Sequence, residues 1–321
     1  MANLRAIRTR IKSVENTRQI TKSMKMVAAA KLRKTQAAFL SLRAYAERSG
    51  DILRQIGGEL TAQDSRPDGA NGVPKTSADA SVRQDEESVP QGADRWILPR
   101  GETRTVCYVL VVGNRGLCGT YNQALLRYCE NIINSSDKQS YVICCGRWGK
   151  DLIASAGIPV RETVEISDTP TREEALELAE RLKTLYSEGT ADEIVLVYQH
   201  YRTVLSQEPT SMTLLPIAAQ VQQSPSESPS CGDVIFEPDR ESVLSTLLDM
   251  YIGNTVHAVL LEARCGEHSA RMTAMTAAAD NTEELIGKLT LELNHARQAA
   301  ITTELSEIAG GAEALRSSKA E

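Results

Sequence analysis

The chain has 321 residues and a net charge of −6, and only 4% of its residues are aromatic. The acidic balance argues against a general nucleic-acid binder, and the shortage of aromatics predicts burial along helix–helix contacts rather than in one large globular core. Seven cysteines form no CxxC pair and no Cys/His cluster, which indicates a reducing compartment. No apolar run is expected to reach the ~20 residues of a membrane span, and the N-terminus lacks the apolar stretch of a secretory signal.

Residues 3–57 are predicted to form one amphipathic helix. Apolar or small residues, Met24 among them, recur at steps of three and four, and Gly57-Gly58 is expected to end the helix. Residues 1–48 contain twelve Lys and Arg but only two Glu. A base-reading helix would gather its basic groups on one face, and a membrane-surface helix would carry bulky apolar anchors. The distributed charges and narrow apolar line favour a coiled-coil helix whose Lys and Arg meet an acidic partner.

The rest of the chain changes character twice. Gly, Pro, Ser and Asp dominate the segment that follows the first helix, which predicts a polar, disordered insertion. Strand-like and helix-like runs then alternate, which predicts an α/β sheet, and the helical period returns at about Asp239. The predicted fold class is α/β: a long antiparallel coiled coil of the terminal helices with an inserted Rossmann-like α/β domain. The predicted segments are helix 1–58, insertion 59–102, α/β domain 103–235 and helix 236–321.

Candidate catalytic chemistry is sparse. The run "VVGNRGLCGTYN" (111–122) places three glycines after a predicted strand, but it lacks the GK[ST] of a phosphate-binding loop, so a tight strand-to-helix turn is the favoured interpretation. The four histidines have no metal-ligand spacing. Cys144-Cys145 lies in a strand-like run and is expected to pack rather than react. No catalytic residue, metal or cofactor is expected. A free-standing α/β nucleotide-binding protein with a coiled-coil arm stays open as an alternative, and a nucleic-acid-binding coiled coil as a third.

Four runs have a distinctive composition: "IRTRIKSVENTRQITKSMKMVAAAKLRK" (7–34), "RGLCGTYN" (115–122), "ARMTAMTAAADN" (270–281) and "ARQAAITTELSEIAGGAEAL" (296–315). Together they resemble one known family, the gamma subunit of F-type ATP synthase. The resemblance implies a non-catalytic central rotor stalk inside a ring of three alpha and three beta subunits, which couples proton translocation to ATP synthesis or hydrolysis on beta. It further implies contacts with the epsilon subunit and the membrane c-ring, no cofactor, no nucleic acid, and peripheral attachment at the cytoplasmic face of a bacterial inner membrane.

The resemblance also implies which residues touch partners. Two match the coupling segment of the N-terminal helix, and four match C-terminal positions that face the partner helix or the beta subunits. Exposed ion pairs are worth only ~0–1 kcal/mol each, which suits contacts that must break at every step. From the pattern alone, the C-terminal group is equally well explained as ordinary exposed polar residues. The implied contact residues are Met24, Lys25, Arg271, Arg297, Gln298 and Thr302.

Overall fold

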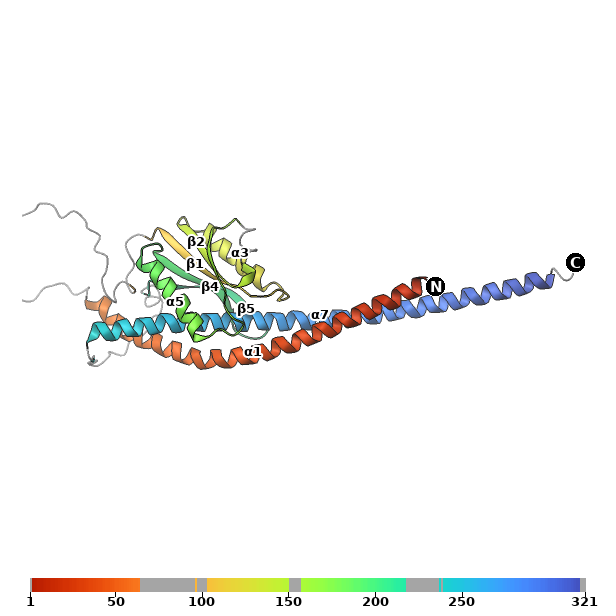
Figure 1. Cartoon of the computed structure of the whole chain (residues 1–321), viewed down its shortest axis with the longest axis horizontal. Helices are drawn as coiled ribbons and strands as arrows, with labels where there is room; N and C mark the ends of the chain where they lie inside the picture. Colours follow the sequence, from red (N-terminus) through yellow and green to blue (C-terminus); the bar gives the residue numbers. More distant parts are fainter. Residues whose placement is uncertain are drawn as a thin grey trace, which may run out of the picture. The chain divides into compact units, whose positions relative to one another are not determined.

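Two long helices open and close the chain, and a five-stranded sheet lies between them in sequence. The helices are α1 (Ala2–Gln63) and α7 (Arg240–Ser317). The described residues form two compact units: a helical unit of 2–30 with 269–317, and a sheet unit within 31–268 (Figure 1). The computed structural model describes residues 2–63, 96, 103–149, 157–217, 237 and 239–317.

The first helix confirms one prediction and corrects another. α1 covers the predicted span 3–57. It does not end at Gly57-Gly58, however, but continues through both glycines to Gln63. A glycine inside a helix costs only ~1 kcal/mol relative to alanine, so it weakens a helix without stopping it.

The sheet unit contains a mixed sheet with the strand order β3-β2-β1-β4-β5. β1 pairs in parallel with β2 and β4, β2 pairs in parallel with β3, and β5 adds an antiparallel edge. Every residue of β1 after the first is buried, as its continuous apolar, β-branched run predicts. The predicted alternation of strands and helices is confirmed, and the strands are β1 (Thr105–Val111), β2 (Gln139–Cys145), β3 (Val160–Val164), β4 (Glu193–Tyr201) and β5 (Gln207–Leu215).

Helices α3 (Tyr121–Asn134) and α5 (Arg172–Ser187) confirm two predicted helices. α5 begins with a capping box in which the side chains of Thr171 and Glu174 satisfy each other's backbone N–H groups. α5 and the first part of α7 share one apolar core with the sheet. They pack closely, because a Cβ added at Gly253 of α7 would lie 2.8 Å from the Leu176 Cδ2 of α5.

Most of the predicted insertion 59–102 lies outside the described residues. α1 occupies its first residues, up to Gln63. Trp96 is buried in the sheet core, where its ring centroid lies 5.9 Å from that of Tyr186. The two compact units divide the chain at other points than the four predicted segments, whose boundaries stay a prediction.

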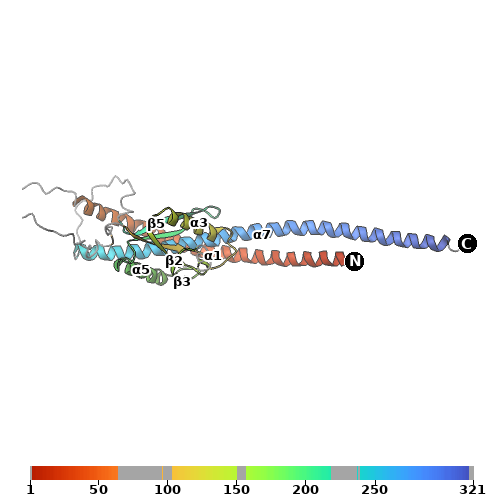
Figure 2. The ribbon, with the colours of Figure 1, turned by 90° about the horizontal axis from the view of Figure 1, so that it is seen from above.

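In the helical unit, the N-terminal part of α1 and the C-terminal part of α7 run side by side in opposite directions (Figure 2). Arg18 pairs with Glu283 across them at 3.6 Å. From Ala279 to Ala300, the buried and half-buried side chains of α7 recur at alternating steps of three and four residues, the heptad spacing of a coiled coil. They are Ala279, Thr282, Ile286, Leu289, Leu293, Ala296 and Ala300.

α7 contains one stretch, between Ser242 and Ala312, that is long and apolar enough to cross a membrane by length and composition. No apolar stretch of this length was expected from the sequence. Half of its most apolar window is buried inside the protein. Core helices meet the same criterion, so the stretch is weak evidence for a membrane span.

Candidate functional site

The crevice where open α/β sheets usually bind ligands is filled by α7. In such sheets the crevice lies at the carboxyl ends of the strands where the strand order reverses, here β1 and β4. Arg264 of α7 donates to the carbonyl oxygen of Val112 at 3.2 Å, directly after β1. Glu262 accepts a hydrogen bond from the backbone N–H of Tyr201, at the end of β4, at 2.9 Å. α7 thus takes the place that a nucleotide would need.

α7 also fills the space beside the glycine-rich turn after β1, so that a ligand has no room there. A Cβ added at Gly113 would lie 2.9 Å from Cδ of Glu267, so no phosphate fits there. The backbone N–H of Gly113 already donates to Asn122 Oδ1 at 2.9 Å. Gly119 has φ +61°, the left-handed conformation that glycine adopts without strain. This geometry favours the strand-to-helix turn over a phosphate cradle.

Arg264 and Glu267 form a buried ion pair at the centre of this contact. Each side chain is only 1% exposed, and Nη1 of Arg264 lies 2.6 Å from Oε2 of Glu267. Nη2 of Arg264 donates to Asn114 Oδ1 and to the Ile166 carbonyl oxygen, both at 3.1 Å. A buried pair is stable only when such additional hydrogen bonds satisfy it. The pair therefore joins α7 to two loops of the sheet.

The described cysteines are poor nucleophiles. All six are buried. Burial raises the pKa of Cys107 and Cys144 to about 12, so both thiols stay protonated at neutral pH. In the part of the chain that the structure describes, no group of three or more His, Cys, Asp or Glu side chains is placed to hold a metal ion.

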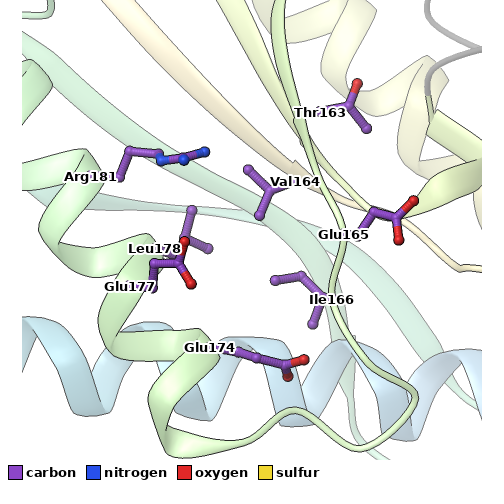
Figure 3. A pocket seen from close by; sticks show the side chains of 8 residues that line it. All are labelled: Thr163, Val164, Glu165, Ile166, Glu174, Glu177, Leu178 and Arg181. Atoms are coloured by element: carbon purple, nitrogen blue, oxygen red, sulfur yellow. The ribbon is translucent and has the colours of Figure 1, made fainter.

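A small hollow of about 240 Å³ lies between β3 and α5 (Figure 3). Ligand pockets usually measure ~300–1,000 Å³. Three of its polar side chains already serve the fold: Glu174 caps α5, Glu165 pairs with Arg147, and Arg181 pairs with Glu162. The hollow is thus a packing gap between β3 and α5, and most of its charged groups are already engaged in the fold.

The six contact residues that the resemblance implies all lie in the helical unit. Lys25 and the C-terminal Arg297, Gln298 and Thr302 are exposed, and Arg271 is half-buried. The Thr302 hydroxyl donates to the Gln298 carbonyl oxygen at 3.0 Å, within α7 itself. The expectation that Met24 lies on the helix–helix contact line is wrong, because the residue is 38% exposed.

Met24 belongs instead to an exposed apolar line, the N-terminal stripe, with Ile20 and Val27. These residues are spaced four and three apart and so share one face of α1. Lys25 lies beside the stripe, between the buried residues Thr21 and Ala28. Heptad spacing would put a buried side chain at position 25, but Lys25 is exposed. The helix–helix contact is therefore interrupted at this residue.

A second exposed line, the C-terminal stripe, consists of Ile301, Leu305 and Ile308. All residues of α7 from 301 to 312 are exposed. In the helical unit α1 contributes 29 residues (2–30) and α7 contributes 49 (269–317), so about 20 residues of α7 extend past the end of α1. At ~1.5 Å per residue this bare end is ~30 Å long.

Comparisons with known proteins agree with this architecture. A family profile described as ATP synthase matches residues 3–315. The chain is 39% identical to the ATP synthase gamma chain of Moorella thermoacetica over 317 residues, which cover 98% of this chain and 100% of that one. The chain belongs to the ATP synthase gamma chain family. A second member, from Synechococcus elongatus, is 36% identical over 342 residues, with 98% of this chain and 99% of that one covered.

Solved structures share the fold of this gamma-family chain. A chain of the Euglena gracilis mitochondrial ATP synthase, solved with OSCP, F1 and c-ring, has a TM-score of 0.65 at 20% identity. The match covers 99% of this chain and 96% of that one. A rotor chain of the same enzyme in another rotational state gives 0.61, with 94% and 99% covered. At this identity the likeness establishes a common fold.

Sequence reasoning missed Ile20, Val27, Ile301, Leu305 and Ile308 as exposed apolar residues. Apolar residues at steps of three and four look the same whether they face a partner helix or solvent. The unequal lengths of the two predicted helices carried the missing signal, because the longer of two paired helices must leave one end uncovered.

Proposed function

We propose that this gamma-family chain is the central rotor stalk of its ATP synthase. In this proposal it turns inside a ring of three alpha and three beta subunits and couples proton translocation to ATP synthesis or hydrolysis on beta. The bare end of α7, exposed at every residue from 301 to 312, is the observation that carries the proposal. A ~30 Å helix end with an uncovered apolar stripe needs a surrounding partner, and a ring of subunits supplies one.

The two stripes and the residues beside them are the proposed contact surface. Ile301, Leu305 and Ile308 would rotate against an apolar inner surface of the alpha/beta ring. Arg297, Gln298 and Thr302 would contact polar groups of the same ring. The part of α1 in the helical unit has seven Lys and Arg against one Glu, so Lys25 beside Met24 would face acidic groups of beta. Arg271, half-buried, would support the shaft near this surface. Individually weak ion pairs can exchange at every step without trapping the rotor.

The chain itself would be non-catalytic and would bind no cofactor. Two observations support this part of the proposal: α7 fills the crevice at the strand ends, and burial keeps Cys107 and Cys144 protonated. ATP would be made and hydrolysed on beta. The sheet unit would contact the epsilon subunit and the c-ring, which places the chain peripherally at the cytoplasmic face of a bacterial inner membrane.

Reconstitution tests the proposal. The full chain is combined with alpha and beta subunits of the same organism, and the complex is weighed by native mass spectrometry. One copy per three alpha and three beta subunits is the expected result. A chain that stays free while alpha and beta assemble would contradict the central-stalk proposal. Titration calorimetry with ATP addresses the alternative of a free-standing nucleotide-binding protein, which requires micromolar binding to the isolated chain.

A further inference from the structure

Asp168 contacts both long helices within the sheet unit. It lies in the loop between β3 and α5. Its Oδ2 accepts a hydrogen bond from Nζ of Lys31, in α1, at 2.5 Å. Its backbone oxygen lies 3.2 Å from Nε2 of His268, in α7. Lys31 is the first residue of α1 in the sheet unit, and His268 is the last residue of α7 in it. One loop residue therefore touches each helix at the boundary of this unit.

The loop that carries Asp168 is itself fixed from two sides. Nδ2 of Asn114 donates to the Ile166 carbonyl oxygen at 2.6 Å and reaches Asp168 Oδ1 at 3.4 Å. Arg264 of α7 donates to the same Ile166 oxygen and to Asn114. Towards α5, the Ser167 hydroxyl lies 2.8 Å from Oε2 of Glu174, the capping residue. Asp168 is thus held on an ordered support.

The charge state of Asp168 suits a permanent contact. Partial burial acts to raise its pKa, but the hydrogen bonds from Lys31 and Asn114 outweigh burial and lower the pKa to about 2. The carboxylate is therefore ionised at any physiological pH. The Asp168 side chain is 26% exposed and that of Lys31 33%, so the pair is screened less than a pair on the open surface. Bonds between ionised partners are also the stronger kind.

We propose that Asp168, through its bonds to Lys31 and His268, is a positioning residue that fixes the sheet unit to both long helices, so that torque passes between them without slack. This inference rests on the proposed rotor function. The continuous helices and the apolar core transmit most of the torque. The Asp168 contact determines how closely the loop between β3 and α5 moves with the helices. Loosening it should leave ATP hydrolysis intact and lower the number of protons moved per ATP.

The test uses the complete ATP synthase in lipid vesicles. The variants are Lys31→Met, Asp168→Asn and the double variant, and Lys34→Met is the matched control. Lys34 is exposed one turn further along α1 and loses the same charge in the control. ATP hydrolysis is measured with an uncoupler present, and ATP-driven proton uptake is measured without it. Hydrogen exchange of the backbone amides of residues 166–169 is followed in the same complexes.

Each single variant should lower proton uptake per ATP by about two- to five-fold, the effect of losing one partly exposed ion pair. Loop amides should exchange faster by a similar factor, and Lys34→Met should match the wild type. The double variant should be no worse than Asp168→Asn alone, because Asp168→Asn already removes the pair with Lys31 together with the longer pair with Arg115 at 3.7 Å. Equal uptake per ATP in every variant, or single effects that multiply in the double, would overturn the proposal.

Two further outcomes are distinguishable. A general loss of stability would lower hydrolysis and uptake together. If Asp168→Asn fails to assemble, Lys31→Arg takes its place: uptake restored relative to Lys31→Met supports the positioning role, and uptake no better than Lys31→Met contradicts it. If the wild-type chain itself drives no uptake, the proposed rotor function fails, whatever the variants do.

Discussion

α7 is one helix with two opposite environments. From Val259 to His268 every residue is buried, and from Ile301 to Ala312 every residue is exposed. Both stretches are rich in polar residues, so composition does not separate them. The difference is what the polar groups meet: those of the buried stretch are bonded inside the sheet unit, while those of the exposed stretch face outward. A polar helix can therefore be a core element or a surface for another protein.

The contrast has an energetic consequence that mutations can test. A change in the buried stretch disturbs groups that have no access to water, and the cost appears as lost stability. A change in the exposed stretch costs little stability, since surface substitutions usually stay within ~0.5 kcal/mol. If the exposed stretch is a contact surface, its changes should appear in the assembled enzyme instead.

The largest expected effect is that of Arg264→Ala. It leaves Glu267 buried without its cation and removes the donor to the carbonyl oxygens of Val112 and Ile166. Breaking a buried pair in this way costs about 3–5 kcal/mol. Urea unfolding of the full chain, followed by circular dichroism, measures the loss.

The matched control is Arg297→Ala, the same change at an exposed position of the same helix. It should alter the free energy of unfolding by less than ~0.5 kcal/mol. Similar losses for the two variants would mean that α7 does not have two environments.

Two glycines of α7 sharpen the comparison, because replacement by alanine should change the free energy of unfolding in opposite directions at the two positions. A Cβ at Gly266 would lie 3.1 Å from Cε2 of Tyr121, a buried ring whose hydroxyl is tied to the Ala263 oxygen at 2.7 Å. Overpacking costs ~1–3 kcal/mol, which exceeds the ~1 kcal/mol gained in helix propensity. Gly266→Ala should therefore destabilise the chain by about 1 kcal/mol.

A Cβ added at Gly287, in the helical unit, would have no contact within 4 Å, so Gly287→Ala introduces no clash. It should stabilise α7 by about 0.5–1 kcal/mol. Thermal unfolding of the two variants beside the wild type gives both signs in one experiment, and a shift in the same direction for both would refute the packing argument.

Acid should weaken the sheet unit through Asp168. Its pKa is lowered from 3.8 to about 2 in the folded chain, so the contribution to stability is complete above pH ~4 and is lost as the pH falls towards 2. Unfolding free energies of the wild type and Asp168→Asn, measured from pH 7 to pH 2, should differ by a constant amount above pH ~4 and converge below it. A difference that persists at pH 2 would point to a cause other than ionisation.

The elements of the fold could be predicted because their signals are local. The period of two or of 3.6 residues in the apolar pattern is present in each segment, and it placed β1, α5 and both terminal helices correctly. The end of α1 was missed because a glycine pair signals a stop only when no favourable residues follow, and helix formers such as Glu59 and Leu60 follow here.

The polar contacts of the sheet unit could not be predicted, because their signals are not local. Arg264 looks like any charged residue of a helix, yet its partners include two backbone carbonyl oxygens, which no residue type encodes. Asp168 and Lys31 lie 137 residues apart. The contact residues taken from the resemblance are brought into one helical unit, but their contacts with other subunits stay a prediction.

The smallest expected effect on stability, and the clearest test of the exposed surface, is Met24→Lys. Met24 lies on the N-terminal stripe, 38% exposed, so the change should leave folding and assembly intact. It adds a cation beside Lys25, where we propose that acidic groups of beta pass. An extra pair worth ~0–1 kcal/mol would slow the release of each contact and should lower proton pumping per ATP by up to about five-fold. Met26→Lys is the control, since Met26 lies two residues further on, ~200° around the helix, and is 71% exposed. Pumping per ATP that is equal in both variants would remove the N-terminal stripe from the coupling surface.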